Sequence, residues 1–160
     1  RVMSIATVHE ILSEATVDEV DVFELIKRVS TTISSNMVNP SANIRVSVRG
    51  ESVHLPSQKA TSLALVANEL LQNALEHGMV GRETGEILIT LTHNPQFLRL
   101  TVIDNGNGLP AHFNAKTDLG LGLDIVRATV QEDMRGKFNI GPRVEGVGTE
   151  VRVKIPLDES

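Results

Sequence analysis

Cysteine, tryptophan and tyrosine do not occur in this chain of 160 residues, and phenylalanine occurs four times. The absence of cysteine excludes a disulfide framework and any metal site built on thiolates. The scarcity of aromatic rings leaves no row of platforms on which nucleic-acid bases could stack. The interior of the folded chain must therefore consist mainly of Leu, Ile, Val and Ala.

Long apolar segments and an excess of positive charge are missing as well. No run approaches the roughly 20 apolar residues that cross a bilayer, and the chain starts with neither Met nor a signal-like segment. We therefore expect a cytoplasmic piece of a longer protein that makes no membrane contact of its own. The net charge is −5, and the basic residues form no cluster along the chain. This charge predicts that nucleic acid is not a partner.

What the chain does contain is typical of one globular domain, with 41% hydrophobic and 22% charged residues. Apolar residues at helical spacing predict a first helix over residues 1–13 and a second that ends near Asn36. Asp21 and Glu24 have the spacing of a capping pair at the start of the second helix. The Asn39-Pro40 pair predicts a turn after it.

The remainder of the chain predicts a mixed α+β fold. Strands are expected at 44–48, 87–91, 98–104, 137–140 and 150–155, and further helices at 56–77 and 120–134. Gly78 is placed to end the long helix as its C-cap, and the aperiodic residues 106–119 form a long loop of the kind that usually has a function. Because the strands outnumber the helical crossovers, we expect a two-layer sandwich with the helices on one face of a mixed sheet.

The first of three polar clusters, NELLQNALEHG, lies on the long predicted helix. Glu69 and Asn73 are four residues apart and share one face, and His77 follows one turn later. A carboxylate and an amide oxygen are hard ligands that suit Mg²⁺ and its waters. The same spacing also fits a helix that simply has a polar edge.

The second cluster, DNGNG, follows the predicted strand 98–104. The Asp104 carboxylate could accept a hydrogen bond from an exocyclic amine such as that of adenine. Gly106 and Gly108 would let the backbone pass close to a flat ligand. Alone, these five residues also fit an ordinary surface turn.

The third cluster, GLGL, opens the predicted helix that begins at Gly120. Gly120 and Gly122 lie where free backbone N–H groups and the helix dipole favour a phosphate. The dinucleotide fingerprint would need a third glycine, and no P-loop Gly-Lys-Ser/Thr occurs. Three further histidines, His54, His93 and His112, are far from one another in the sequence. We therefore predict that they do not form a metal-binding site.

In this order and spacing, from residue 56 to residue 157, the clusters resemble the N, G1 and G2 boxes of an ATPase superfamily. That superfamily contains gyrase, heat-shock chaperones, mismatch-repair proteins and histidine kinases. The closing GTEVRVKIPL is similar to the final Gly-Thr strand of histidine kinases, and RVMSIATVHEIL resembles the second helix of their dimerisation hairpin. The resemblance implies a Bergerat-type ATP-binding catalytic domain over residues 16–160, preceded by the end of a hairpin helix over 1–15.

The resemblance also implies a role for individual residues. Asn73 would bind Mg²⁺, Glu69 would order a water or assist the acceptor, and Asp104 would read adenine. Gly106 and Gly108 would line the base, and residues 109–119 would form the ATP lid. The implied nucleotide site also includes His77, Lys116, Gly120, Leu121, Gly122 and Thr149, of which Thr149 would hold a water beside Asp104.

A kinase of this kind would bind Mg-ATP and pass the γ-phosphoryl to a histidine on a hairpin helix outside this sequence. Catalysis would rest mainly on positioning and charge neutralisation. A response regulator receiver domain would receive the phosphoryl next, and the missing hairpin helices would form a homodimer.

Two features keep alternatives open. His9 begins a His-Glu pair like the one at the start of the phosphoacceptor box of many histidine kinases. An acceptor histidine would need a hairpin of two long helices before the catalytic domain, and only one further helix fits between His9 and the strand at Ile44. A packing role for His9 and an acceptor upstream are therefore favoured.

Related kinases commonly carry Lys three residues after the Mg²⁺-binding Asn, where this chain has Glu76. The alternatives are a serine kinase of the anti-sigma type and a nucleotide-dependent binding module without transfer activity.

Overall fold

The computed structural model describes residues 19–37 and 42–157. The predicted helix over 1–13, the hairpin segment 1–15, His9 and the turn at Asn39-Pro40 lie outside these residues. No helix in the described part of the chain is long and apolar enough to span a membrane.

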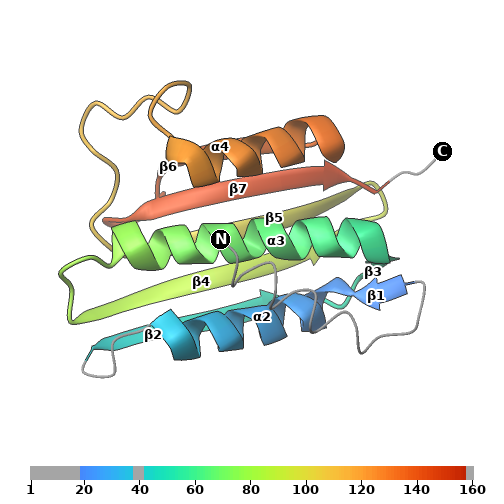
Figure 1. Cartoon of the computed structure of the whole chain (residues 1–160), viewed down its shortest axis with the longest axis horizontal. Helices are drawn as coiled ribbons and strands as arrows, with labels where there is room; N and C mark the ends of the chain where they lie inside the picture. The colour runs from blue at the N-terminus through green and yellow to red at the C-terminus, as the bar shows by residue number, and fades with distance from the viewer. Residues whose placement is uncertain (1–18, 38–41, 158–160) are drawn as a thin grey trace.

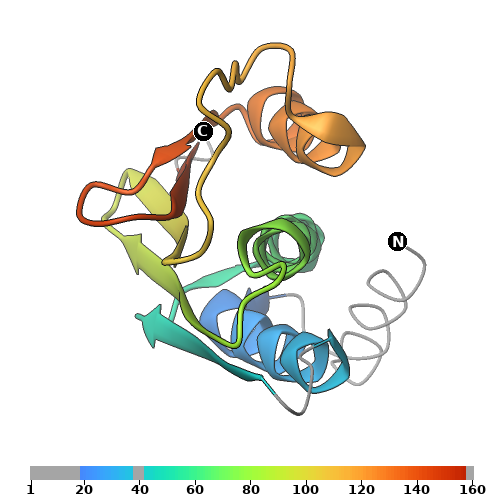
Figure 2. The same cartoon turned by 90° about the vertical axis from the view of Figure 1, so that its left-hand side faces the viewer.

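The fold has two layers, a five-stranded sheet and a layer of helices on one of its faces (Figures 1 and 2). The strand order is β2 (Asn43–Gly50), β4 (Thr84–His93), β5 (Phe97–Asp104), β7 (Thr149–Pro156) and β6 (Lys137–Pro142). Strands β2 and β4 are parallel, whereas the other three pairs are antiparallel. The helices are α2 (Val22–Met37), α3 (Ser57–Asn73) and α4 (Gly120–Ala128). The predicted two-layer fold with a mixed sheet is confirmed.

The start of α2 bears out the predicted cap. Asp21 Oδ1 accepts hydrogen bonds from the backbone N–H groups of Phe23, at 3.1 Å, and Glu24, at 3.5 Å. The sequence did not predict the small antiparallel sheet of β1 (Glu19–Asp21) and β3 (His54–Pro56). Strands of three residues are too short to show a period, so only tertiary contact reveals their pairing.

The end of the long helix differs from the prediction. After Asn73 the chain continues through a π-helical turn, Ala74–Gly78, closed by a hydrogen bond from Met79 N to Ala74 O at 3.0 Å. Gly78 is not in the left-handed conformation of a C-cap glycine, and Met79 occupies the cap with φ −102°. The prediction of Gly78 as a C-cap is therefore wrong. Helix α4 also ends in a π-helical turn, Thr129–Asp133.

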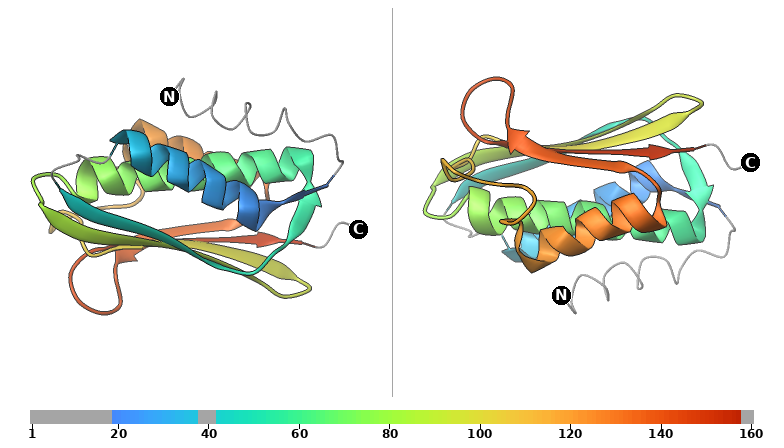
Figure 3. Two further views of the ribbon diagram at one scale, coloured as in Figure 1. Left: turned by 90° about the horizontal axis from the view of Figure 1, so that it is seen from below. Right: turned by 90° about the horizontal axis from the view of Figure 1, so that it is seen from above.

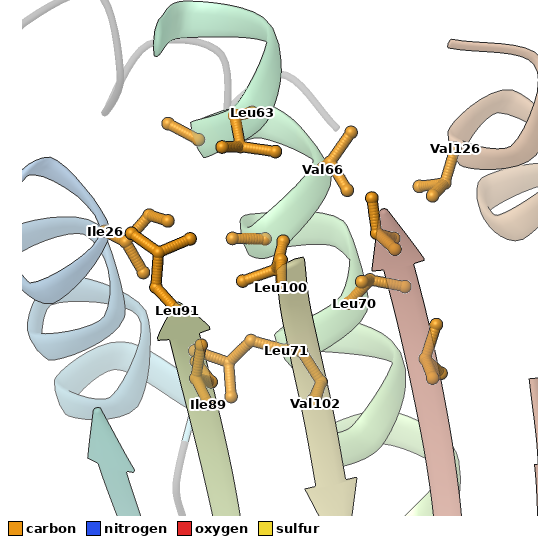
Figure 4. Close-up of a cluster of buried hydrophobic side chains, with 14 of the residues drawn as sticks. Ile26, Leu63, Val66, Leu70, Leu71, Ile89, Leu91, Leu100, Val102 and Val126 are labelled. Atoms are coloured by element: carbon orange, nitrogen blue, oxygen red, sulfur yellow. The ribbon is translucent and has the colours of Figure 1, made fainter. Parts of the chain in front are cut away.

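The core lies between the helices and the covered face of the sheet, and it is aliphatic as predicted (Figure 4). Leu71 of α3 and Leu100 of β5 are fully buried. Burial of a side chain of this size stabilises the fold by about 1.5–3 kcal/mol relative to exposure. The central helix α3 contacts both α2 and α4, and it therefore fixes the position of α4 and of the loop before it.

Candidate functional site

A cavity of about 670 Å³ opens between α3, β5, β7 and the loop that precedes α4. Its volume lies within the usual range for small-molecule sites, roughly 300–1,000 Å³. The structure brings six of the predicted site residues to its wall, namely Asn73, His77, Asp104, Gly108, Gly120 and Thr149. They come from four separate segments of the chain.

Asp104, at the end of β5, is the buried acid of this cavity, with 4% of its surface exposed. Its Oδ1 accepts hydrogen bonds from Gly106 N at 2.8 Å and Thr149 N at 3.4 Å. Burial raises the pKa of Asp104 above its ordinary value, although these two bonds and the charges of Arg143 and Arg82 lower it. Both bonds fix Oδ1, so Oδ2 can accept a hydrogen bond from a ligand.

Glycines enclose this carboxylate because larger residues would not fit. A Cβ on Gly106 would lie 2.1 Å from Gly78 O, and one on Gly78 would lie 3.1 Å from Asp104 Oδ2. A Cβ on Gly148 would lie 1.9 Å from Asp104 O. Sequence reasoning missed the contacts of Gly78 and Gly148 with Asp104, because these close approaches join segments far apart in the chain.

The DNGNG segment is built into the fold and is not a free surface turn. Asn105 exchanges two hydrogen bonds with Glu86 of β4: Glu86 N donates to Asn105 Oδ1 at 2.7 Å, and Asn105 N donates to Glu86 O at 3.2 Å. Asn107 donates from its backbone N to Gly78 O at 2.8 Å and from Nδ2 to Val80 O at 2.9 Å. These bonds tie the segment to β4 and to the end of the long helix.

The structure separates Glu69 from Asn73, although both lie on α3. Asn73 lines the cavity, whereas Glu69 lines a second groove of about 360 Å³ between α3 and α4. Gly122 also lines this groove, and a Cβ on it would lie 2.7 Å from Glu69 Oε2. The backbone of α4 therefore packs directly against the Glu69 carboxylate.

A divalent cation fits this cavity only when a bound nucleotide supplies further oxygen ligands. Within residues 19–37 and 42–157, no three His, Cys, Asp or Glu side chains gather closely enough to hold a metal. Asn73 offers one amide oxygen at the cavity wall. Mg²⁺ commonly takes one or two protein ligands together with phosphate oxygens and water, so this donor suits a Mg-nucleotide better than free Mg²⁺.

The loop over residues 109–119 has internal hydrogen bonds. Asn114 N donates to Asp118 Oδ2 and Asp118 N donates to Asn114 O, both at 2.8 Å. Arg127 of α4 donates from Nη1 to Ala115 O at 3.0 Å. Of the remaining predicted residues, Gly106 lies against Asp104, to which its backbone N–H donates. Lys116 and Leu121 are exposed and line neither the cavity nor the groove.

The prediction omitted part of the cavity wall. Apolar side chains of the sheet, of α3 and α4 and of the loop before α4 line it, and these include Leu70, Val102, Leu119, Leu123, Ile140 and Val151. Asp118, two residues before the GLGL cluster, also lines the cavity. Asp118 and Leu119 belong to the predicted lid, residues 109–119, although neither was given a role of its own. The other residues look like ordinary core positions in the sequence.

The chain matches the family described as histidine kinase-, DNA gyrase B-, and HSP90-like ATPase over residues 58–159. The match covers more than half of the chain, so the chain belongs to this family of ATPases. Among proteins similar to it, the sensor histidine kinase PdtaS of Mycolicibacterium smegmatis is 33% identical over 98% of this chain. The aligned region is 31% of that protein, so the chain spans about a third of its relative's length.

Solved histidine kinases have the same fold. The histidine kinase domain of a blue-light-activated histidine kinase from Erythrobacter litoralis matches 98% of this chain and 72% of that chain, with a TM-score of 0.82 and 26% identity. The histidine kinase ThkA, solved in complex with the response regulator protein TrrA, matches 99% of this chain and 48% of that chain. Its TM-score is 0.69 and its identity 23%, and it supports the fold alone.

Proposed function

We propose that this domain binds Mg-ATP and serves as the catalytic domain of a sensor histidine kinase. The observation that carries the proposal is Asp104, a buried carboxylate at the cavity wall with one oxygen held by two backbone N–H groups. A buried acceptor of this kind selects a ligand that donates a hydrogen bond, because other ligands would leave it without a partner. The exocyclic amine of adenine is such a donor.

The other residues have complementary roles in this proposal. Gly106 and Gly108 leave room for the base, and Thr149 holds a water beside Asp104. Asn73 binds Mg²⁺, which neutralises phosphate charge when bound. Gly120, Leu121 and Gly122 open α4, where backbone N–H groups favour phosphate.

Two further side chains, His77 and Lys116, extend this proposed nucleotide site. His77 lines the cavity one turn after Asn73. Lys116 lies in the loop over residues 109–119, which we propose closes as a lid and brings its cation toward the phosphates.

The phosphoryl acceptor in this proposal is a histidine on a hairpin helix outside the described residues. Glu69 lies in the groove between α3 and α4, beside the cavity rather than in it. We infer that it acts at the side from which the acceptor approaches, where it orders a water or assists the histidine. Residues 1–15 are the end of the hairpin and residues 16–160 the catalytic domain.

The proposed partners are a second copy of the protein, joined through the hairpin helices, and the receiver domain of a response regulator. The similarity to PdtaS over nearly the whole chain favours a sensor kinase over a serine kinase of the anti-sigma type. Because the proposed substrate is ATP, we place the domain in the cytoplasm.

Calorimetric titration of Mg-ADP into this chain and its Asp104→Asn variant tests the pocket. A hydrogen bond to a charged group contributes about 1.5–3 kcal/mol, so we expect the variant to bind roughly 10–100-fold more weakly. Glu132→Gln, in the exposed π-helical turn after α4, removes one charge away from the cavity and should bind like the wild type. Equal affinities for the folded Asp104→Asn variant and the wild type would reject the assignment.

Glu76 favours a second candidate, a binding module without transfer activity. It places a negative charge one turn after Asn73, where related kinases commonly have Lys. Glu76→Lys should strengthen Mg-ATP binding a few-fold at low salt. Glu76 does not itself line the cavity, but the substitution changes the charge one turn after Asn73 from negative to positive. If the wild-type domain, joined to its hairpin, transfers no phosphoryl while Glu76→Lys does, the binding module is the better description.

A further inference from the structure

The face of the sheet that the helices leave uncovered has a charge opposite to that of the whole chain. All three helices lie on the other side (Figure 3). Side chains alternate along a strand, so the neighbours of each core residue point to the open face. In β5, Leu100 and Val102 are buried in the core, whereas Arg99 and Thr101 belong to the open face.

This open face gathers basic residues from four strands. It carries six of the 15 Lys and Arg residues, namely Arg45, Arg49, Arg99, Lys137, Arg152 and Lys154. It carries two of the 20 Asp and Glu residues, Glu86 and Glu150. The formal charge of the face is therefore +4, whereas the eight basic and 13 acidic residues in the rest of the described chain give −5.

Three of these cations stand side by side in one row. Arg99 pairs with Lys154 across β5 and β7, and Lys154 pairs with Lys137 across β7 and β6. Like charges directly opposite one another destabilise a sheet. Among the described residues none of the three pairs with a carboxylate, although Lys154 Nζ lies 4.1 Å from the centre of the Phe97 ring.

The rest of the face is less strongly charged. Arg152 Nη1 lies 3.4 Å from Glu150 Oε2, and Arg45 Nη1 lies 4.0 Å from Glu86 Oε2. Leu88 and Ile103 are directly opposite each other on β4 and β5 and are half-buried. A patch with an apolar area beside unpaired charges has the composition of a protein interface.

We propose that this open face docks an acidic surface of a protein. Carboxylates set against Arg99, Lys137 and Lys154 would relieve the repulsion within the row. A nucleic acid or an anionic membrane fits less well, because its field extends beyond the face and would repel the charge of −5 on the rest of the described chain. The face also has a single aromatic side chain, Phe97, and so lacks the stacking platforms of a nucleic-acid surface.

The test uses this chain, labelled for NMR, and a short peptide of alternating Glu and Ser as the probe. We expect chemical-shift changes confined to β5, β6 and β7. The triple variant Arg99→Gln, Lys137→Gln and Lys154→Gln should bind the peptide roughly tenfold more weakly. The matched control is Lys27→Gln, Arg28→Gln and Lys59→Gln, which removes the same charge from helices α2 and α3 and should bind like the wild type.

Two other measurements make the outcome decisive. Without peptide, the triple variant should unfold at a higher temperature than the wild type at low salt, because its row no longer repels itself. Equal loss of peptide binding in both triple variants would overturn the proposal, and so would tighter binding of a DNA duplex or phosphatidylserine vesicles than of the peptide. Titration with Mg-ADP keeps this test separate from the proposed nucleotide site, since both triple variants should retain nucleotide binding.

Discussion

The two faces of the sheet use the same five strands for opposite purposes. The covered face is apolar and holds one buried acid, Asp104, beside the cavity. The open face is charged, and none of the described helices lies over it. Ile103 and Asp104 are consecutive in β5, yet the first belongs to the open face and the second to the candidate site.

Strand register therefore decides which residues line the candidate site and which lie on the open face. A shift of one residue would move Asp104 out of the cavity and place Ile103 in it. The antiparallel pairings of β5 with β4 and β7 hold the register, and the glycines around Asp104 allow no larger residue in their place. The site therefore depends on the whole sheet.

The largest predicted effect contrasts neighbouring residues of β5. Leu100→Ala, on the covered face, should lower the free energy of unfolding by about 2–5 kcal/mol because it leaves a cavity in a fully buried position. Thr101→Ala, on the open face, should cost about 1 kcal/mol, since it removes one hydrogen bond with Thr90. Urea denaturation measures both, and equal losses would contradict the contrast.

A smaller effect is expected for an added methyl group. Gly106→Ala should cost about 1–3 kcal/mol and weaken Mg-ADP binding, because the new Cβ collides with the carbonyl of Gly78. Gly141→Ala is the control on the opposite side, where a Cβ would meet nothing within 4 Å. Thermal unfolding and calorimetry on both variants check this prediction. Unchanged stability of Gly106→Ala would mean that the segment moves easily.

The third prediction concerns the pH dependence of stability. The pKa of Asp104 is raised in the folded state, so the native protein binds its proton more tightly than the unfolded chain does. Stability from this group is present below the unfolded pKa and is lost as the pH rises through the folded value. Asp104→Asn should therefore gain stability relative to the wild type as the pH rises from the ordinary carboxyl pKa of 3.8 through the folded value.

Urea denaturation across this pH range tests the sign of that difference. Glu150→Gln, on the open face, is the control: it shows how the loss of one negative charge alone changes the free energy of unfolding. If Asp104→Asn lost stability relative to the wild type as the pH rose, ionised Asp104 would be stabilising the fold and the assigned direction would be wrong.

The smallest effect concerns the loop over the cavity. Arg127→Ala removes the hydrogen bond to Ala115 O and the ion pair with Asp124 at 2.8 Å, which is partly exposed. We expect faster hydrogen exchange in residues 114–118 and a loss of global stability below about 1 kcal/mol. Arg152→Ala, on the open face, should leave that exchange unchanged. Protection by Mg-ATP in the wild type would support a lid, and no protection would argue against one.

Much of the fold could be predicted because its signals are local. The alternation of apolar residues gave four of the five long strands to within two residues at each end, and the GLGL cluster marked the start of α4. Asp21 was recognised as a cap because a helix start depends on a few adjacent residues. The short strands β1 and β3 and the ending of α3 gave no such signal, since contacts with distant segments decide them.

The period, capping and composition of each element can be read directly from the sequence, which also places Asp104, Asn73 and the glycines in three separate clusters. The folded structure is needed to see that Asn73 lines the cavity whereas Glu69 lines the groove between α3 and α4, and that Gly78 lies against Asp104. It also gathered basic residues that form no cluster along the chain onto one face. The reason is that strand pairing joins residues far apart in sequence, whereas period and composition describe neighbours.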